Sequence, residues 1–356
     1  MASTTHTSAT SSEKVSKRQW ITKHELVELS KIKPSRIIAD LGLNWLLIVA
    51  TIQIALLAGN TFPLWAAVIV YALAFIGIAC LQNALTLWAH EASHYNLSRD
   101  KKRNDIIGDL FVAGPIGMTV GQYRWHHVPH HLYLNDPERE VNPLAWICIR
   151  GTHLFKEIIL SMLGKYGVQA ITRYGSDDPK YEKRPSRTPA SLVSFLISNG
   201  LLFALCALQG QWYAFFILWI APIFTLTLMI GNFRTIVEHQ SSSDVCDTGL
   251  VPLPAITRVI QSHPLERLLI APVGLYFHHE HHMYPGVPYH RLRDVRKLLT
   301  ERGYFSSSEI VYGDGYVRTL WRIAMQPGYG IRLLNPFMVV EDDHGHAPEA
   351  AATLPY

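Results

Sequence analysis

Residues 64–94 read LWAAVIVYALAFIGIACLQNALTLWAHEASH, and this stretch decides the fold. Residues 64–88 contain no Asp, Glu, Lys or Arg, and they are long enough to cross a bilayer, which takes about 20 apolar residues in an α-helix. The span leads directly into His90-Glu91-Ala92-Ser93-His94. Because side chains at i and i+4 share one helix face, the stretch predicts a transmembrane helix with two imidazoles side by side at its end.

Three more apolar stretches, at residues 37–57, 189–208 and 212–231, have a similar length. All 32 Lys and Arg residues lie outside residues 37–98 and 188–233, and these windows include the short links AGNTFP and QGQ. A soluble protein with buried helices rarely has four such runs. The predicted fold is therefore an all-α integral membrane protein with four transmembrane helices in two hairpins. The positive-inside rule assigns both termini, and a helical cap that carries the histidine clusters, to the cytoplasmic side.

Composition sets the limits of the membrane domain. Residues 1–36 are expected to form a disordered cytoplasmic segment, residues 37–340 the membrane domain and residues 341–356 a disordered tail. The net charge of +4 contains no basic block of the nucleic-acid-binding kind, so no nucleic-acid partner is expected. The four cysteines form no CxxC pair, which argues against a disulfide framework or a rubredoxin-type iron site.

Histidines are the strongest chemical signal in the chain, which has 18 of them. After the first pair, two clusters follow in YRWHHVPHHLYLNDP and LYFHHEHHMYPGVP, and a single histidine in NFRTIVEHQ. These segments contain His126, His127, His130, His131, His278, His279, His281, His282 and His239. Both clusters contain the pattern His-x-x-His-His near the predicted ends of helices. Imidazole binds iron, zinc, copper and nickel, and eight or nine imidazoles are too many for one ion but suit two.

Two other classes of protein fit parts of this pattern. In a membrane zinc metalloprotease, His90 and His94 would bind zinc and Glu91 would act as general base, but the later clusters would then have no role. A histidine-rich metal transporter would place ionisable side chains along its membrane helices, whereas Asp40 is almost the only one here.

The three clusters, in this order, resemble the boxes HxxxH, HxxHH and HxxHH of the membrane fatty-acid desaturase and hydroxylase superfamily. The flanking segments YRWHHVPHH and FHHEHHMYPGVPYHRL are similar to that family's motifs, and the resemblance covers roughly residues 37–300. It implies a di-iron enzyme that uses O2 as co-substrate. It also implies nine iron ligands, which are His90, His94, His127, His130, His131, His239, His278, His281 and His282. The extra histidines His126 and His279 leave the register open by one residue.

The resemblance implies a fatty-acyl or lipid substrate and, most directly, a desaturase that inserts a C=C bond by removing two hydrogens. A hydroxylase, ketolase or oxidative decarboxylase on the same scaffold is the alternative. The chain has no flavin or nicotinamide fingerprint, so electrons are expected from an external ferredoxin, rubredoxin or cytochrome b5. Carboxylates beside the boxes are candidates to orient the ligand rings through their second nitrogens: Glu91, Glu238 and Glu280.

Two segments outside the four spans are apolar. Residues 104–121 are interrupted by Gly114-Pro115 and Gly117, so they are expected to lie at the membrane interface or to re-enter. Residues 143–170 mix apolar and basic side chains and are predicted to form an amphipathic surface helix. Lys101-Lys102-Arg103 is expected to meet anionic lipid, with a phosphate-bearing head group or an acidic redox partner as further options.

Overall fold

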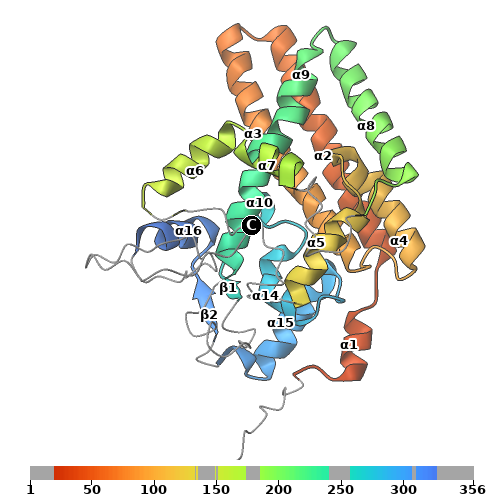
Figure 1. Ribbon diagram of the computed structural model, residues 1–356, viewed down its shortest axis with the longest axis vertical. Helices are drawn as coiled ribbons and strands as arrows, with labels where there is room; N and C mark the ends of the chain where they lie inside the picture. Colours follow the sequence, from red (N-terminus) through yellow and green to blue (C-terminus); the bar gives the residue numbers. More distant parts are fainter. Residues whose placement is uncertain are drawn as a thin grey trace, which may run out of the picture.

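The computed structural model describes residues 20–132, 134, 149, 151–173, 185–239, 257–306 and 310–326. Four helical runs are long and apolar enough to cross a membrane, which confirms the predicted number. They are α2 (Pro34–Thr61), α3 (Leu64–Ser93), α8 (Pro189–Ala207) and the run Tyr213–Glu238. The last run consists of α9 (Tyr213–Phe215), the π-helical turns η4 (Phe216–Ile220) and η5 (Ile223–Thr227), and α10 (Leu228–Glu238). Figure 1 shows these helices along the long axis, with the remaining elements gathered towards one end.

Two of these helices extend further than their apolar stretches. Proline lies at the start of α2 and immediately before α3, where its fixed φ favours the first turn. At the other end, α3 continues past residue 88 to Ser93, and the last run continues past residue 231 to Glu238. A helix does not have to stop where the apolar side chains stop, since its hydrogen bonds are internal. His90 therefore lies inside the last turn of α3.

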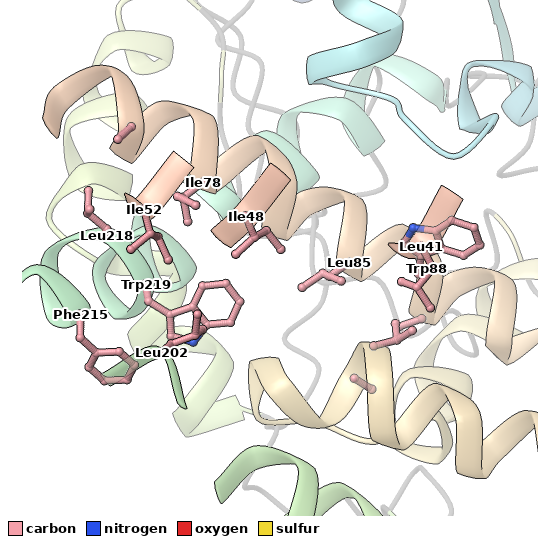
Figure 2. Close-up of a cluster of buried hydrophobic side chains, with 14 of the residues drawn as sticks. Leu41, Ile48, Ile52, Ile78, Leu85, Trp88, Leu202, Phe215, Leu218 and Trp219 are labelled. Atoms are coloured by element: carbon pink, nitrogen blue, oxygen red, sulfur yellow. The ribbon is translucent and has the colours of Figure 1, made fainter. Parts of the chain in front are cut away.

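The core between the helices is built from side chains on their facing sides (Figure 2). Leu41, Ile48 and Ile52 of α2 meet Ile78 and Leu85 of α3, and Leu202, Phe215, Leu218 and Trp219 complete the cluster. The buried Gln82 donates to the Trp219 carbonyl (2.7 Å), which satisfies a polar group among apolar neighbours. Large apolar side chains on the opposite faces are exposed, among them Leu64 (81%) and Leu196 (61%). Such an outward apolar surface fits contact with lipid.

The interrupted segment after α3 forms three short elements. They are α4 (Lys101–Gly108), the π-helical turn η1 (Asp109–Ala113) and the 3₁₀ turn η2 (Gly114–Ile116). Their backbone is tied to the spans, because Trp45 donates to the Phe111 carbonyl (2.9 Å) and Asn199 to the Pro115 carbonyl (3.0 Å). Irregular backbone at the edge of a membrane needs such partners.

The predicted amphipathic helix at 143–170 is wrong as one continuous element. Its described part forms α6 (His153–Met162) and α7 (Lys165–Arg173), and residues 143–148 lie outside the described residues. Gly164 separates the two helices with a φ of 87°, a left-handed conformation that glycine adopts without steric cost. The glycine was visible in the sequence as a helix terminator.

The remaining elements form the end of the molecule opposite the free tips of the spans (Figure 1). In chain order they are α5 (Val120–Leu132), β1 (Arg258–Ile260), α13 (Pro264–Leu269), η6 (Leu275–Phe277), α14 (His278–Met283), η7 (Tyr289–Arg291), α15 (Leu292–Glu301), η8 (Tyr304–Ser306), β2 (Val311–Gly313) and α16 (Tyr316–Met325). β1 and β2 pair in parallel, with Val259 opposite Tyr312. This small sheet departs from the all-α prediction, because it joins segments far apart in the sequence.

One helix lies inside the segment 1–36 that we expected to be disordered. α1 (Lys23–Leu29) begins with a capping box in which Thr22 and Glu25 bond each other's backbone N–H groups. Leu29 is buried, and Glu25 pairs with Arg302 after α15. Tertiary contacts order this polar stretch, whereas residues 1–19 and the tail 341–356 lie outside the described residues. Cys80 and Cys206 are buried free thiols, and Cys148 and Cys246 are not among the described residues.

Candidate metal centre

Histidines from four helix segments converge at this end of the molecule. The first set comprises His90, His94, His127, His131 and His281, and one ring nitrogen from each of them lies within 4.8 Å of those of the others. We call it the five-histidine group. A second set meets the same limit with His130, His239 and His282. The Nε2 of His278 lies 3.0 Å from that of His239, so His278 joins this set, which we call the four-histidine group. The structure therefore brings all nine predicted histidines together and divides them into two neighbouring groups.

Helices α5 and α14 each supply histidines to both groups, but in opposite proportions. On α5, His127 and His131 belong to the five-histidine group and His130 to the other. On α14 the assignment is reversed, because His278 and His282 serve the four-histidine group and His281 the five-histidine group. Successive residues of an α-helix are about 100° apart, so i and i+4 point one way and the adjacent histidine another. His-x-x-His-His thus supplies two rings to one group and one ring to its neighbour.

Ring nitrogens approach one another at distances typical of ligands around one ion. The Nε2 of His127 lies 3.0 Å from that of His94 and 2.9 Å from that of His131. The Nε2 of His239 lies 3.1 Å from that of His130 and 3.2 Å from that of His282. A neutral imidazole has one N–H, so it cannot satisfy several facing nitrogens by hydrogen bonding alone. Two nitrogens bound about 2.1 Å from a metal at a right angle lie about 3 Å apart, which matches these contacts.

Buried nitrogens without partners support the same interpretation. Neither ring nitrogen of His90 has a hydrogen-bond partner among the described residues, although the side chain is 2% exposed. Buried polar groups almost always find a partner. A metal ion bound to His90 would satisfy one nitrogen of this ring. The residues present therefore fit a metal centre with imidazole ligands.

Burial favours the neutral form of most of these rings, as metal binding requires. Burial lowers the pKa of His94 from 6.5 to about 3. Burial likewise holds the pKa well below its usual value in His127, His131, His239, His278, His281 and His282. His239 Nδ1 donates to the Thr235 carbonyl (2.9 Å), which leaves the Nε2 lone pair facing the group.

The extra histidines that left the register open are outside both groups. The ring nitrogens of His279 lie 2.7 Å from the hydroxyls of Thr257 and Tyr304, so both nitrogens are occupied. His126 Nδ1 lies 3.2 Å from the Gln122 carbonyl in the preceding turn of α5. Both contacts point these rings away from the convergent nitrogens. The geometry thus follows the spacing that begins with His127 and His278.

The three candidate carboxylates differ in what they contact. Glu91 accepts a hydrogen bond from the Tyr289 N–H (2.8 Å), and its nearer oxygen is 3.7 Å from His90 Nδ1, longer than a hydrogen bond. Glu238 accepts from the Tyr316 hydroxyl (2.9 Å) and lies 3.5 Å from His278 Nδ1.

The third carboxylate, Glu280, pairs with Arg296. Direct orientation of a ligand ring by any of the three carboxylates stays a prediction, and Glu238 is the best placed of them.

Two arginines that sequence reasoning missed hold the helix ends at this centre. Arg124 of α5 donates to the carbonyls of Ser93 (2.9 Å) and Ala92 (3.1 Å), next to His94. Arg258 of β1 is 1% exposed and donates to the carbonyls of Val237 (3.0 Å) and His239 (2.9 Å). The last carbonyls of a helix lack internal partners and carry partial negative charge, so a cation stabilises them. No local motif reveals this role, because each arginine belongs to a different element from the helix whose carbonyls it bonds.

We expect Arg258→Ala to weaken metal binding by the four-histidine group by about 10- to 100-fold, because His239 loses the support of its backbone. The metal content per chain, measured after dialysis against graded chelator, tests this. A double-substitution comparison assigns the effect to a group. Arg258→Ala should lower the metal content of His127→Ala further but leave that of His239→Ala unchanged. Equal further losses in both backgrounds would refute a local role for Arg258.

Comparison with known proteins shows which family this chain belongs to. The pattern of the family described as Fatty acid desaturase matches residues 30–313, a range that includes both histidine groups. Dihydrorhizobitoxine desaturase of Bradyrhizobium elkanii is 28% identical over 249 residues, 66% of this chain and 69% of that protein. Delta 8-(E)-sphingolipid desaturase of Komagataella phaffii is 22% identical, and the alignment covers 65% of this chain but 48% of that protein.

A fatty acid desaturase of Bacillus subtilis is 24% identical over 57% of this chain and 60% of its own length. The chain spans about half the length of the sphingolipid desaturase it matches. The relatives share the word desaturase and differ in the molecule that their names specify. The family match covers most of the chain, from the start of the first span to the second strand. This chain is therefore a member of the fatty acid desaturase family, a membrane oxidoreductase with histidine clusters able to bind metal.

Proposed function

We propose that this protein is an O2-dependent di-iron desaturase that removes two hydrogens from a fatty-acyl or lipid chain and leaves a C=C bond. The observation that carries the proposal is the division of nine imidazoles into two neighbouring groups. Rings of His131 and His282, one from each group, stack with centroids 4.2 Å apart. Two ions held by the groups would thus lie close together, as a two-metal oxidation centre needs.

We assign the nine histidines of the two groups as the metal ligands. Their imidazole nitrogens are suitable donors for iron. Imidazole suits iron, zinc and copper, and the family match favours a redox-active metal over zinc. Iron bound here would activate O2 and supply an oxidant strong enough for an unactivated C–H bond. The protein's own contribution is to fix neutral rings in place and to exclude water. His90, Glu238 and His281 are 2%, 0% and 0% exposed, so bulk water has little access.

The membrane arrangement completes the proposal. The four spans form two hairpins, and the histidine groups and both termini face the cytoplasm, where an external ferredoxin, rubredoxin or cytochrome b5 delivers electrons. An acyl chain reaches the centre from the bilayer. The names of the relatives include fatty acid and sphingolipid, which supports a lipid-type substrate. Hydroxylation, ketone formation and oxidative decarboxylation are the competing outcomes, because small shifts in substrate position decide between them.

Metal content and product mass test this function together. We expect the purified protein to contain about two irons per chain and, with a reduced donor and O2, to yield lipids that lack two hydrogens. His127→Ala is the matched inactive control. One zinc per chain without iron would refute the proposal, and a product that gains one oxygen would show hydroxylation instead. Screening total lipids of an expressing host by mass spectrometry avoids having to guess the substrate.

A further inference from the structure

The structure has a basic, largely apolar groove well outside the histidine groups. It measures about 1000 Å³ and lies between α1, the link to α2 and the turn before α4. The three cations in its wall are Lys23, Lys31 and Arg99, and no Asp or Glu lines it. Leu26, Ile32 and Leu97 supply the apolar part of the wall. We propose that this groove binds the head group of an anionic phospholipid of the surrounding bilayer.

Arg99 forms the fixed part of the groove. Its guanidinium donates to the carbonyls of Tyr95 (3.2 Å) and Gly286 (2.8 Å) and to that of Ser30, which joins three separate segments. All of these acceptors are neutral, so they hold the guanidinium in place without cancelling its charge. A positioned cation at the edge of an apolar groove attracts a phosphate group.

The charge around the groove is mainly positive. Lys23, Lys33 and the run Lys101-Lys102-Arg103 make no ion pair with another described residue, whereas Lys31 pairs with Glu28 (2.6 Å). Each basic side chain near an anionic bilayer contributes about 1 kcal/mol of attraction. Figure 1 shows α1 and α4 on the same side of the molecule.

The groove also lies where a lipid head group would be. The exposed apolar face of α2 begins at Ile38 (72% exposed), one helical turn or about 6 Å after Pro34 in the groove wall. On the other side of the groove, Arg99 of the wall is followed in the chain by Lys101–Arg103 and then by the exposed Ile106 and Phe111. The Trp45–Phe111 hydrogen bond holds α2 and η1 against each other. The chain on both sides of the groove thus changes from basic to apolar in the same direction, which matches a phosphate followed by its acyl chains.

Retention of lipid tests this proposal without any need for catalysis. The protein is placed in nanodiscs of phosphatidylcholine with phosphatidylglycerol, released into mild detergent and analysed by native mass spectrometry. We expect about one phosphatidylglycerol to remain per wild-type chain, and Lys23→Glu with Lys31→Glu to reduce this retention at least about 10-fold. The matched control is Arg293→Glu with Lys297→Glu on α15, which changes the charge equally and should retain the lipid.

Two results would overturn the proposal. One is an equal loss of phosphatidylglycerol in both double variants, which would mean that net charge alone attracts the lipid. The other is unchanged lipid retention together with slower reduction by an acidic electron donor, which would assign the groove to a protein partner. Because retention is measured on resting protein, its failure leaves the proposed desaturase function untouched, and failure of that function leaves the groove untouched.

Discussion

His127→Ala should abolish activity and reduce iron from about two to about one per chain, whereas its neighbour His126→Ala should keep both. His127 Nε2 is within 3.0 Å of two other ring nitrogens of the five-histidine group, while His126 bonds a backbone carbonyl of its own helix. Changes outside the ligand sphere already cost 10- to 100-fold, so losing a ligand should lower activity by at least about 100-fold. Iron analysis and product formation on the same samples measure both effects.

The pair of variants is informative because the substitutions are adjacent and chemically identical. His239→Ala should likewise lose about one iron, from the four-histidine group. His127→Ala combined with His239→Ala should then retain almost none. Loss of activity in His126→Ala together with full activity in His127→Ala would shift the ligand register by one residue and contradict the proposed ligand set.

Glu238→Leu should produce the largest loss of stability. Glu238 is 0% exposed and pairs with Arg234, which is 8% exposed, at 2.5 Å. Removing the carboxylate leaves a buried cation without its partner, and such changes cost about 3–5 kcal/mol. The midpoint of thermal unfolding, followed by fluorescence-detected size exclusion in detergent, should therefore fall sharply. Glu301→Leu, which breaks the exposed i,i+4 pair with Lys297, should leave the midpoint essentially unchanged.

A second substitution separates stability from support of the metal site. Arg234→Leu with Glu238→Leu removes both charges, so much of the stability should return. If Glu238 also holds His278, whose Nδ1 lies 3.5 Å away, the double variant should still lose iron from the four-histidine group. Full stability with full iron content would limit Glu238 to neutralising Arg234.

The sequence was informative wherever the signal is local. Four apolar stretches predicted four spans, because hydropathy over about 20 residues is a property of the segment itself. The limits of these helices were less predictable, as α3 and α10 continue beyond their apolar parts to Ser93 and Glu238. Helix α1 was missed because its order comes from Arg302 and from core contacts far away in the chain. The β1–β2 pair was missed for the same reason.

For the candidate metal centre, the sequence by itself determined the positions of the histidine boxes and the spacing that separates neighbours on a helix, and the family resemblance implied the nine histidines that converge. Consecutive positions diverge by about 100°, so each His-x-x-His-His was bound to divide its rings between two directions. Only the tertiary structure decided which rings share a group: His127 and His131 with His281, and His130 with His278 and His282. That partition depends on how α5 and α14 are rotated against α3 and α10, and their rotation is set by packing and by anchors such as the half-buried Arg124 and the buried Arg258. These contacts join residues distant in the chain, so no local pattern encodes them.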